Sequence, residues 1–436
     1  MIFSCLRDLL RAQPPAPTAP TRSGFPPVAF DKNIEGLRGI AALSVVFAHL
    51  FEYGIDPLFQ PDGVLAQVKF SHLSVLLFFV LSGYVIGLTN PPGPFSWRLA
   101  GNYLKKRFVR LYPIYAVAIL LSVVAIPETD GLNVLSNLAF LQFALTKSLK
   151  GNIVLWTLNF EVLYYLLFLG ILYLKPNLKV LLALAFGVSN LGLVFPQVPG
   201  LLTFYASGWV FWLSGLYLAR HLPRLRQTAP PANVVLSFLL LLIANNVFMP
   251  GFMLLSFAGL LDVVPLALVC NADLVHLPVV LVLFAVAAGL QLPFRKLLTL
   301  ASFALPLAVV GALYVLGKST EHDNFVIGTV CTLAACGLYF VPIRGNVLAR
   351  FSFMGSLSYA LYVIHMPVAN LLRQIDFFAG TPASFAVRLV AFLLVVLGLS
   401  YALELKMQPW IRDRFFPRKK AQPKPELGLP QVAQAA

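Results

Sequence analysis

Long apolar segments alternate with short polar ones along almost the whole chain. About twelve apolar windows are each close to the roughly 20 residues that a helix needs to cross a bilayer. They lie near residues 34–54, 69–89, 108–127, 154–174, 177–196, 201–220, 233–250, 274–292, 298–317, 324–343, 354–375 and 384–405. A further apolar run, 251–270, is interrupted by Asp262 and Pro265, and the run 132–146 is short enough to favour an interfacial or re-entrant piece. The pattern predicts an all-α polytopic membrane protein with ten to twelve transmembrane helices.

The composition supports this class and excludes others. Hydrophobic residues make up 59% of the chain and charged residues 11%, and the mean hydropathy is +0.83, so a soluble domain would lack the charges to cover its surface. The net charge of +15 does not indicate a nucleic-acid partner, because the basic residues cluster at helix ends on one side. We expect no disulfide framework and no metal site, since the four cysteines show no CxxC spacing. These cysteines are Cys5, Cys270, Cys331 and Cys336.

The distribution of basic residues predicts the topology. Most of the 32 lysines and arginines fall on one side of the membrane when the N-terminus is placed inside, notably in the expected loop 98–110 and in segment 220–226. The positive-inside rule then places both termini in the cytoplasm. We expect a Pro-rich N-terminal segment (1–32), one transmembrane domain (33–406) and a basic tail (407–436), anchored in a lipid bilayer.

The first predicted helix carries Arg38 and His49, eleven residues apart. At about 100° per residue both side chains face the same way, and at ~1.5 Å per residue they lie roughly 16 Å apart along the axis. This arrangement is open to two interpretations. The two side chains could line a path along which a reaction takes place. Alternatively, the arginine could reach the membrane edge while the histidine is hydrogen-bonded inside the bundle.

An arginine pair precedes the third apolar window. Arg107 and Arg110 have i, i+3 spacing and share a helical face at the inner membrane surface. Guanidinium groups there can bind phosphates in a bidentate manner, whereas a simple stop-transfer cluster would only fix topology. We accept the topological interpretation for Lys105 and Lys106 and keep both interpretations for the arginines.

Two other helices place polar residues in the membrane. Glu161 lies within the fourth window, where a carboxylate costs ~2.5 kcal/mol or more and therefore needs a partner. Ser82 and Gly83, in the second window, allow close approach of another helix or of a ligand.

The eleventh window carries a polar face of its own. Ser358, Tyr362 and His365 fall at i, i+4 and i+7, and Pro367 should kink the helix and release backbone carbonyls near His365. Two histidines on separate helices, together with the arginines and Glu161, indicate a polar cavity. The other histidines need no special role, and they are His72, His221, His276 and His322.

Five motifs in order resemble the acyltransferase-3 family of membrane-embedded acyltransferases, from Asn33 to about Pro417. The resemblance is carried by GLRGIAALSVVFAH with Arg38 and His49, FFVLSGY with Ser82, Arg107 and Arg110 before YP, WTLNFEVLYY with Glu161, and SYALYVIHMP with Tyr359, Tyr362 and His365. Two features depart from the family pattern. The chain has about one more pair of helices than the usual ten, within 233–297, and its short tail carries no SGNH-type esterase domain. Such a chain would complete transfer itself or pass the acyl group to a separate periplasmic transferase.

The resemblance implies an O-acyltransferase of the bacterial inner membrane that uses cytoplasmic acyl-CoA as co-substrate, with acetyl-CoA the expected form. Its members O-acetylate surface polysaccharides and related sugars of the cell envelope, so the acceptor would be a hydroxyl of a carbohydrate or glycolipid. In this interpretation Arg107 and Arg110 clamp the nucleotide end of the donor, and Arg38 holds its pyrophosphate or pantetheine arm. His49 would act as general base or become transiently acylated.

The remaining residues would complete the acceptor site. Glu161 would orient an imidazole or bind the acceptor, while Ser82, Tyr362 and His365 would line the cavity or donate to the oxyanion. Two alternatives remain open. A secondary transporter of an anionic or lipid-linked solute would also place polar residues inside a helix bundle, and an unrelated intramembrane acyltransferase could use a histidine with Asn159.

Overall fold

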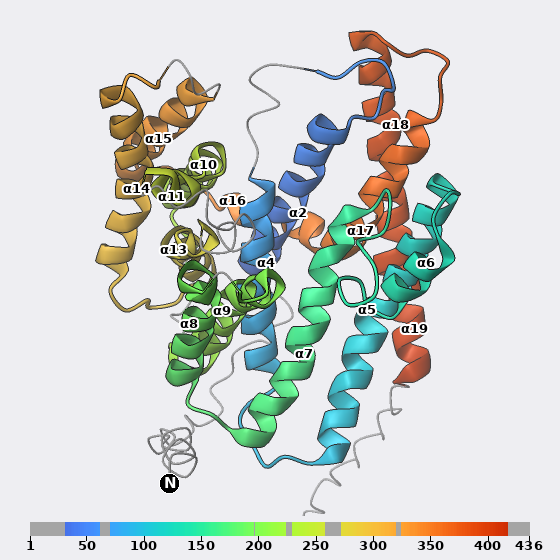
Figure 1. The fold of residues 1–436 in the computed structure, drawn as a ribbon, viewed down its shortest axis with the longest axis horizontal. Helices are drawn as coiled ribbons and strands as arrows, with labels where there is room; N and C mark the ends of the chain where they lie inside the picture. The colour runs from blue at the N-terminus through green and yellow to red at the C-terminus, as the bar shows by residue number, and fades with distance from the viewer. Residues whose placement is uncertain are drawn as a thin grey trace, which may run out of the picture.

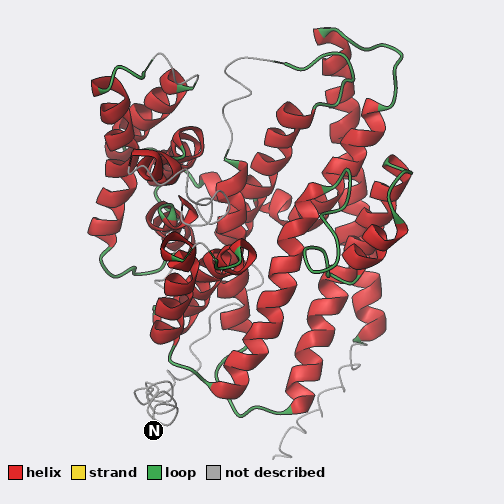
Figure 2. Cartoon of the chain, in the orientation of Figure 1, coloured by secondary structure: helices red, strands yellow, loops and turns green. Residues whose placement is uncertain are grey.

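The computed structural model describes residues 31–61, 70–195, 197–223, 229–257, 272–319 and 324–416. Within these ranges the chain is helical and forms no strand, in agreement with the predicted all-α class (Figure 1, Figure 2). Several predicted features lie outside the described residues. These are residues 1–30, Asp262, Pro265, Cys270, His322 and the tail from 417.

Most of the longer helices overlap the apolar windows of the sequence. Their bounds are α2 (Lys32–Tyr53), α4 (Ser71–Thr89), α5 (Trp97–Ala125), α6 (Gly131–Leu138), α7 (Trp156–Leu174), α8 (Leu178–Val194), α9 (Gly200–His221), α10 (Ala232–Phe248), α11 (Pro250–Phe257), α13 (Leu277–Ala288), α14 (Arg295–Val315), α15 (Phe325–Phe340), α16 (Val347–Arg350), α17 (Ser352–Arg373), α18 (Pro382–Tyr401) and α19 (Gln408–Phe415). A π-helical turn, Ala402–Met407, joins α18 to α19.

Seven of the described helical segments are long and apolar enough to cross a membrane, and four shorter apolar helices accompany them. The seven are α2, α4, α5, Ile153–Leu174, α9, α14 and Pro382–Phe415. The short run after residue 131 is no span, as expected, because α6 has only eight residues. The chain is therefore an integral membrane protein.

Residues 98–110 were expected to form a loop, but they are helical, so the predicted backbone conformation was wrong. Helix α5 begins at Trp97 and continues without interruption through the basic cluster into the apolar window. Ser96 caps it, because its hydroxyl accepts a hydrogen bond from the Leu99 backbone N–H at 3.2 Å. Lysine and arginine are good helix formers, so their charge alone does not end a helix.

Glycines set the closest helix contacts, as the sequence suggests for Gly83. A Cβ at Gly83 would lie 1.9 Å from the Trp212 carbonyl oxygen, so α4 and α9 pack at backbone distance. A Cβ at Gly355 would lie 1.9 Å from the Glu35 carbonyl oxygen, which brings α17 equally close to α2. The second contact holds together the two helices that carry the histidines.

Two groups of helices are visible in Figure 1. Helices α10, α11, α13, α14 and α15 gather at the left, whereas α5, α7, α17 and α18 stand at the right. Helices α2 and α4 lie between the two groups. The candidate site is built by the right-hand group together with α2 and α4.

Candidate active site

A cavity of about 270 Å³ lies among α2, α4, α5, α7 and α17. It brings together most of the residues selected from the sequence, although they come from five separate helices. Its polar lining residues are Arg38, Ser82, Arg107, Arg110, Thr157, Glu161, Tyr165, Ser358, Tyr359 and Tyr362. The structure thus has a cavity lined by several of the predicted polar residues, without the two histidines.

Arg38 is anchored on α17. Its Nε donates to the Ser358 hydroxyl at 2.8 Å, and its Nη2 donates to the Gly355 carbonyl at 2.7 Å. The carboxylate of Glu35, one turn earlier on α2, lies 3.0 Å from the same Nη2. Arg38 is therefore held inside the bundle by directed hydrogen bonds and does not simply extend to the membrane edge.

His49 and His365 contact each other directly across α2 and α17. His49 Nδ1 lies 2.9 Å from His365 Nε2, and the two rings stack with centroids 5.1 Å apart. His365 Nδ1 lies 3.2 Å from the Leu361 carbonyl, which can only accept, so this nitrogen carries the proton. In the neutral rings His365 Nε2 then accepts from His49 Nδ1–H. The remaining nitrogen, His49 Nε2, carries the lone pair.

The histidine pair lies just beyond the cavity and does not line it. Phe78 and Tyr362 form the boundary, with ring centroids 5.8 Å apart, and the Tyr362 ring lies 6.2 Å from that of His365. Pro367 lies within α17, and one backbone carbonyl near His365 is available to a side-chain donor, as predicted. The Val363 carbonyl, which has no N–H partner at Pro367, accepts a hydrogen bond from Asn152 at 3.0 Å.

Glu161 has partners, but they are hydroxyl groups. Ser82 donates to its carboxylate at 3.2 Å, and Tyr165, one turn later on α7, also donates to it. Neighbouring Asn159 is used structurally, because its amide donates to the Phe140 carbonyl at 2.6 Å and it does not line the cavity. Asn159 therefore holds the chain near Phe140, whereas Glu161 lines the cavity.

The two arginines of α5 differ in their surroundings. Arg110 forms a bidentate pair with Glu404, with N–O distances of 2.5 and 3.2 Å. Arg107 lies over the rings of Tyr103 and Tyr165, at 5.4 and 5.5 Å from their centroids. Both arginines line the cavity, but only Arg110 is neutralised by a carboxylate of the described chain.

The sequence analysis missed Glu404. Its side chain is almost fully buried and also accepts from the Ala360 backbone N–H at 3.3 Å. Glu404 lies in the π-helical turn after α18, and such turns are frequent at functional sites. The available signal was a single carboxylate at the end of the last apolar window.

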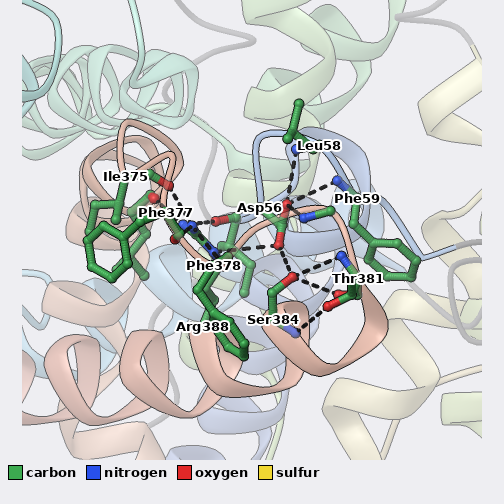
Figure 3. A network of polar contacts seen from close by, with 12 residues as sticks. Asp56, Leu58, Phe59, Ile375, Phe377, Phe378, Thr381, Ser384 and Arg388 are labelled. Atoms are coloured by element: carbon green, nitrogen blue, oxygen red, sulfur yellow. Dashed lines mark hydrogen bonds and ion pairs between the residues drawn. The ribbon is translucent and has the colours of Figure 1, made fainter.

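A second buried ion pair was also missed. Asp56, just after α2, lies 3.5 Å from Arg388 on α18, and both side chains are buried (Figure 3). Asp56 accepts from the Ser384 hydroxyl at 2.6 Å and from backbone N–H groups that include Gly380. Arg388 donates to backbone carbonyls at the end of α17, including Leu372 at 2.6 Å. This network joins the ends of α2 and α17 nearest the histidines.

The other histidines that the structure describes do not line the cavity. His72 contacts Asp273 at 2.5 Å, and His221 stacks on Tyr217. No group of three or more His, Cys, Asp or Glu side chains that could hold a metal ion occurs in the part of the chain that the structure describes.

Comparison with known proteins identifies the family. A family model described as an acyltransferase domain matches residues 31–405. The chain is also 37% identical over 90 residues to a protein described as "Protein 2 in picA locus" of Rhizobium radiobacter, an alignment that covers 20% of this chain and 41% of that protein. No solved structure matches the chain significantly. The family match does not favour the transporter alternative, and the chain belongs to the acyltransferase-3 family, as a membrane acyltransferase.

Proposed function

We propose that this acyltransferase moves an acyl group, with acetyl as the expected group, from cytoplasmic acyl-CoA to a hydroxyl of a carbohydrate or glycolipid. The membrane would be the inner membrane of a bacterium. One observation carries the proposal: a cavity with Arg38, Arg107 and Arg110 adjoins a pair of contacting imidazoles. Arginines suit the phosphates of a donor, and a neutral imidazole suits proton transfer from an acceptor hydroxyl.

His49 acts as the general base in this proposal. Its Nε2 removes the proton from the acceptor hydroxyl, whose oxygen attacks the thioester carbonyl. The carbon–sulfur bond then breaks, and the imidazolium returns the proton to the leaving thiolate. His365 holds the required tautomer, and the Glu52 carboxylate, 4.0 Å from His49 Nε2, stabilises the transient positive charge.

The donor enters from the Arg107 side of the cavity. Arg107 and Arg110, in the first half of α5, bind phosphates of the donor. Arg38, on α2, contacts the arm of the donor deeper in the cavity. Phe78 and Tyr362 separate this cavity from the histidines, so the arm must displace one of the two rings to deliver the thioester.

Glu161, Ser82 and Tyr362 complete the site on the acceptor side. The Tyr362 hydroxyl accepts from Thr157 at 3.0 Å and donates to the Val154 carbonyl at 3.3 Å, and in this proposal it turns from that carbonyl to donate to the oxyanion of the tetrahedral intermediate. Glu161 and Ser82 present a bonded carboxylate–hydroxyl pair for recognition of acceptor hydroxyls. The acyl group is either transferred directly to the acceptor hydroxyl or passed to a separate periplasmic transferase.

The direct test uses purified protein with labelled acetyl-CoA and an envelope glycan fraction. Wild type should transfer label, and His49→Ala should abolish transfer while its membrane abundance stays near wild type. His221→Ala is the matched control, because this histidine stacks on Tyr217 away from the cavity. Full acylation of the acceptor by His49→Ala would exclude His49 as the base.

Donor access depends on topology, with both termini expected in the cytoplasm. After replacement of the native cysteines, a membrane-impermeant thiol reagent should label a cysteine at Glu128 in intact cells and miss one at Arg98. These positions lie beyond opposite ends of the apolar part of α5. Labelling at Arg98 would reverse the orientation and remove the basis for a cytoplasmic donor.

A further inference from the structure

A second hollow, of about 350 Å³, lies at the start of α5, near the cavity described above. Apart from Leu99, its lining consists of polar residues. They are Asn90, Ser96, Arg98, Asn102, Tyr103 and Lys106. None of these residues is acidic, so the hollow is suited to an anion.

The two basic side chains of this hollow lie in one row with an asparagine between them. Arg98, Asn102 and Lys106 are spaced i, i+4 and i+8, which places them on the same face of α5. The positive end of the α5 dipole lies beside them, because the helix begins at Trp97. Both contributions favour a ligand with several negative charges.

Two buried donors between the hollow and the cavity lack an acceptor among the described residues. The Tyr103 hydroxyl is buried, and Tyr103 lines the hollow. The Arg107 Nε is also buried without a hydrogen-bond partner in the described chain, and Arg107 lines the cavity. A buried donor left unsatisfied costs about 1–3 kcal/mol, so a ligand that accepts from both would be favoured. These donors point to an elongated anionic ligand that runs from one space into the other.

The dimensions fit a donor with phosphates at one end and a thioester at the other. Arg98 to Arg110 spans twelve residues, or roughly 18 Å of helix. Because Glu404 already pairs with Arg110, the basic groups not neutralised by a carboxylate of the described chain lie nearer the start of α5. We infer that the hollow around Arg98 and Lys106 binds the phosphomonoester of the nucleotide end of acyl-CoA. This inference rests on the proposed function and extends its donor site.

Lys105 provides a natural comparison with Lys106. Its Nζ donates to the Phe415 carbonyl at 3.1 Å and lies over the ring of Phe416, so this side chain docks onto α19 and its end. Lys105 does not line the hollow, whereas the adjacent Lys106 does. The sequence analysis gave both lysines a topological role, and the structure distinguishes them.

The test compares two donors in three proteins. Wild type, Lys106→Ala and Lys105→Ala are assayed with acetyl-CoA and with acetyl-3′-dephospho-CoA. For Lys106→Ala we expect KM for acetyl-CoA to rise about tenfold, as for loss of one charged hydrogen bond, with kcat unchanged. Its KM for the dephospho donor should equal the wild-type value, and Lys105→Ala should match wild type with both donors. Equal KM increases for the two donors, or no increase, would overturn the subsite.

Direct binding separates this inference from the proposed function. Adenosine 3′,5′-bisphosphate should bind wild type and Lys105→Ala about tenfold more tightly than Lys106→Ala. Such binding without any acyl transfer by wild type would refute the proposed reaction and retain the anion site. Acyl transfer with equal nucleotide affinity in all three proteins would refute the subsite alone, and wild type that neither binds nor transfers would refute both.

A lipid headgroup offers the same phosphate chemistry, so the assays are run in neutral detergent and in nanodiscs with phosphatidylglycerol. The expected result is a Lys106→Ala effect of the same size in both. An effect confined to phosphatidylglycerol nanodiscs, and equal for both donors, would assign the hollow to lipid and overturn the donor subsite.

Discussion

Two buried arginine–carboxylate pairs lie in different parts of the helix bundle and differ in how completely they are satisfied. Arg388 and Asp56 have side chains only 7% and 0% exposed, and Arg388 also donates to several backbone carbonyls (Figure 3). Arg110 pairs with an equally buried Glu404, but its own side chain is 36% exposed and faces the cavity. One pair is closed on all sides, and the other presents its cation to a space that a ligand can enter.

This difference separates a structural role from a functional one. A buried pair is costly to form but far more costly to break, because the remaining charge stays in a low-dielectric environment. Arg388 and Asp56 have no accessible face left for a substrate, so we expect them to fix the ends of α2 and α17. Arg110 keeps an open face, so we expect Glu404 to orient it for the donor. Three predictions test this contrast, from the largest effect to the smallest.

The largest effect is expected from Arg388→Ala. Loss of one partner of a closed buried pair should destabilise the protein by about 3–5 kcal/mol, because Asp56 would remain buried and charged. Arg110→Ala should destabilise less, because removal of the Arg110 side chain, which lines the cavity, would open the buried Glu404 to water from that cavity. The measurement is the midpoint of thermal unfolding in detergent, together with the amount of protein recovered from membranes. Equal loss of stability in the two variants would remove the distinction between the pairs.

An intermediate effect is expected from Glu404→Gln, which keeps the shape and a carbonyl acceptor but removes the charge. Arg110 would lose its orienting partner, so KM for the acyl donor should rise by up to about tenfold while the unfolding midpoint changes little. Asp413→Asn is the control, because Asp413 pairs with Arg412 at the exposed surface. A changed acceptor KM with an unchanged donor KM would place Arg110 outside the donor site.

The sequence predicted those parts of the site that depend on spacing within one helix. Arg38 and His49 share the face of α2 that packs on α17, and Pro367 releases the Val363 carbonyl as expected. Gly83 lies at a close helix contact, as predicted, because a residue without a side chain lets the backbone of another helix approach closely. These features follow from local geometry.

The sequence could not predict pairings between helices that are distant along the chain. Arg388 and Glu404 are charges in the last apolar window that the sequence analysis did not select, and nothing in their spacing identifies Asp56 or Arg110 as the partner. The helical start of α5 was missed for a different reason. A basic segment next to an apolar window has the composition expected of a loop between membrane spans, although here it is helical. Charge patterns report the side of the membrane and not the backbone conformation.

The smallest effect concerns the pH dependence of the closed pair. Burial raises the pKa of Asp56, but hydrogen bonds from the Ser384 hydroxyl and from three backbone N–H groups outweigh burial and hold that pKa below its usual range. A folded-state pKa that lies below the unfolded one, about 4, contributes stability above the unfolded pKa. This contribution is lost as the pH falls through the folded pKa. The network should therefore weaken only in acid, below about pH 4.

A comparison of Ser384→Ala with Thr381→Ala separates this contribution from helix capping, in which both hydroxyls take part. The variant removes the 2.6 Å hydrogen bond to Asp56, so its folded-state pKa should rise towards the unfolded one, with a loss of about 1 kcal/mol at neutral pH that shrinks in acid. Thr381→Ala also disrupts the start of α18, since its hydroxyl accepts from the Ser384 backbone N–H, but it leaves the Asp56–Ser384 bond in place. Its loss should be of similar size and independent of pH. Thermal midpoints between pH 7 and about pH 2, which extend well below the unfolded pKa of Asp56, measure both variants. If the two curves run parallel to wild type, the Ser384 hydroxyl acts as a cap alone and the charge of Asp56 does not depend on it.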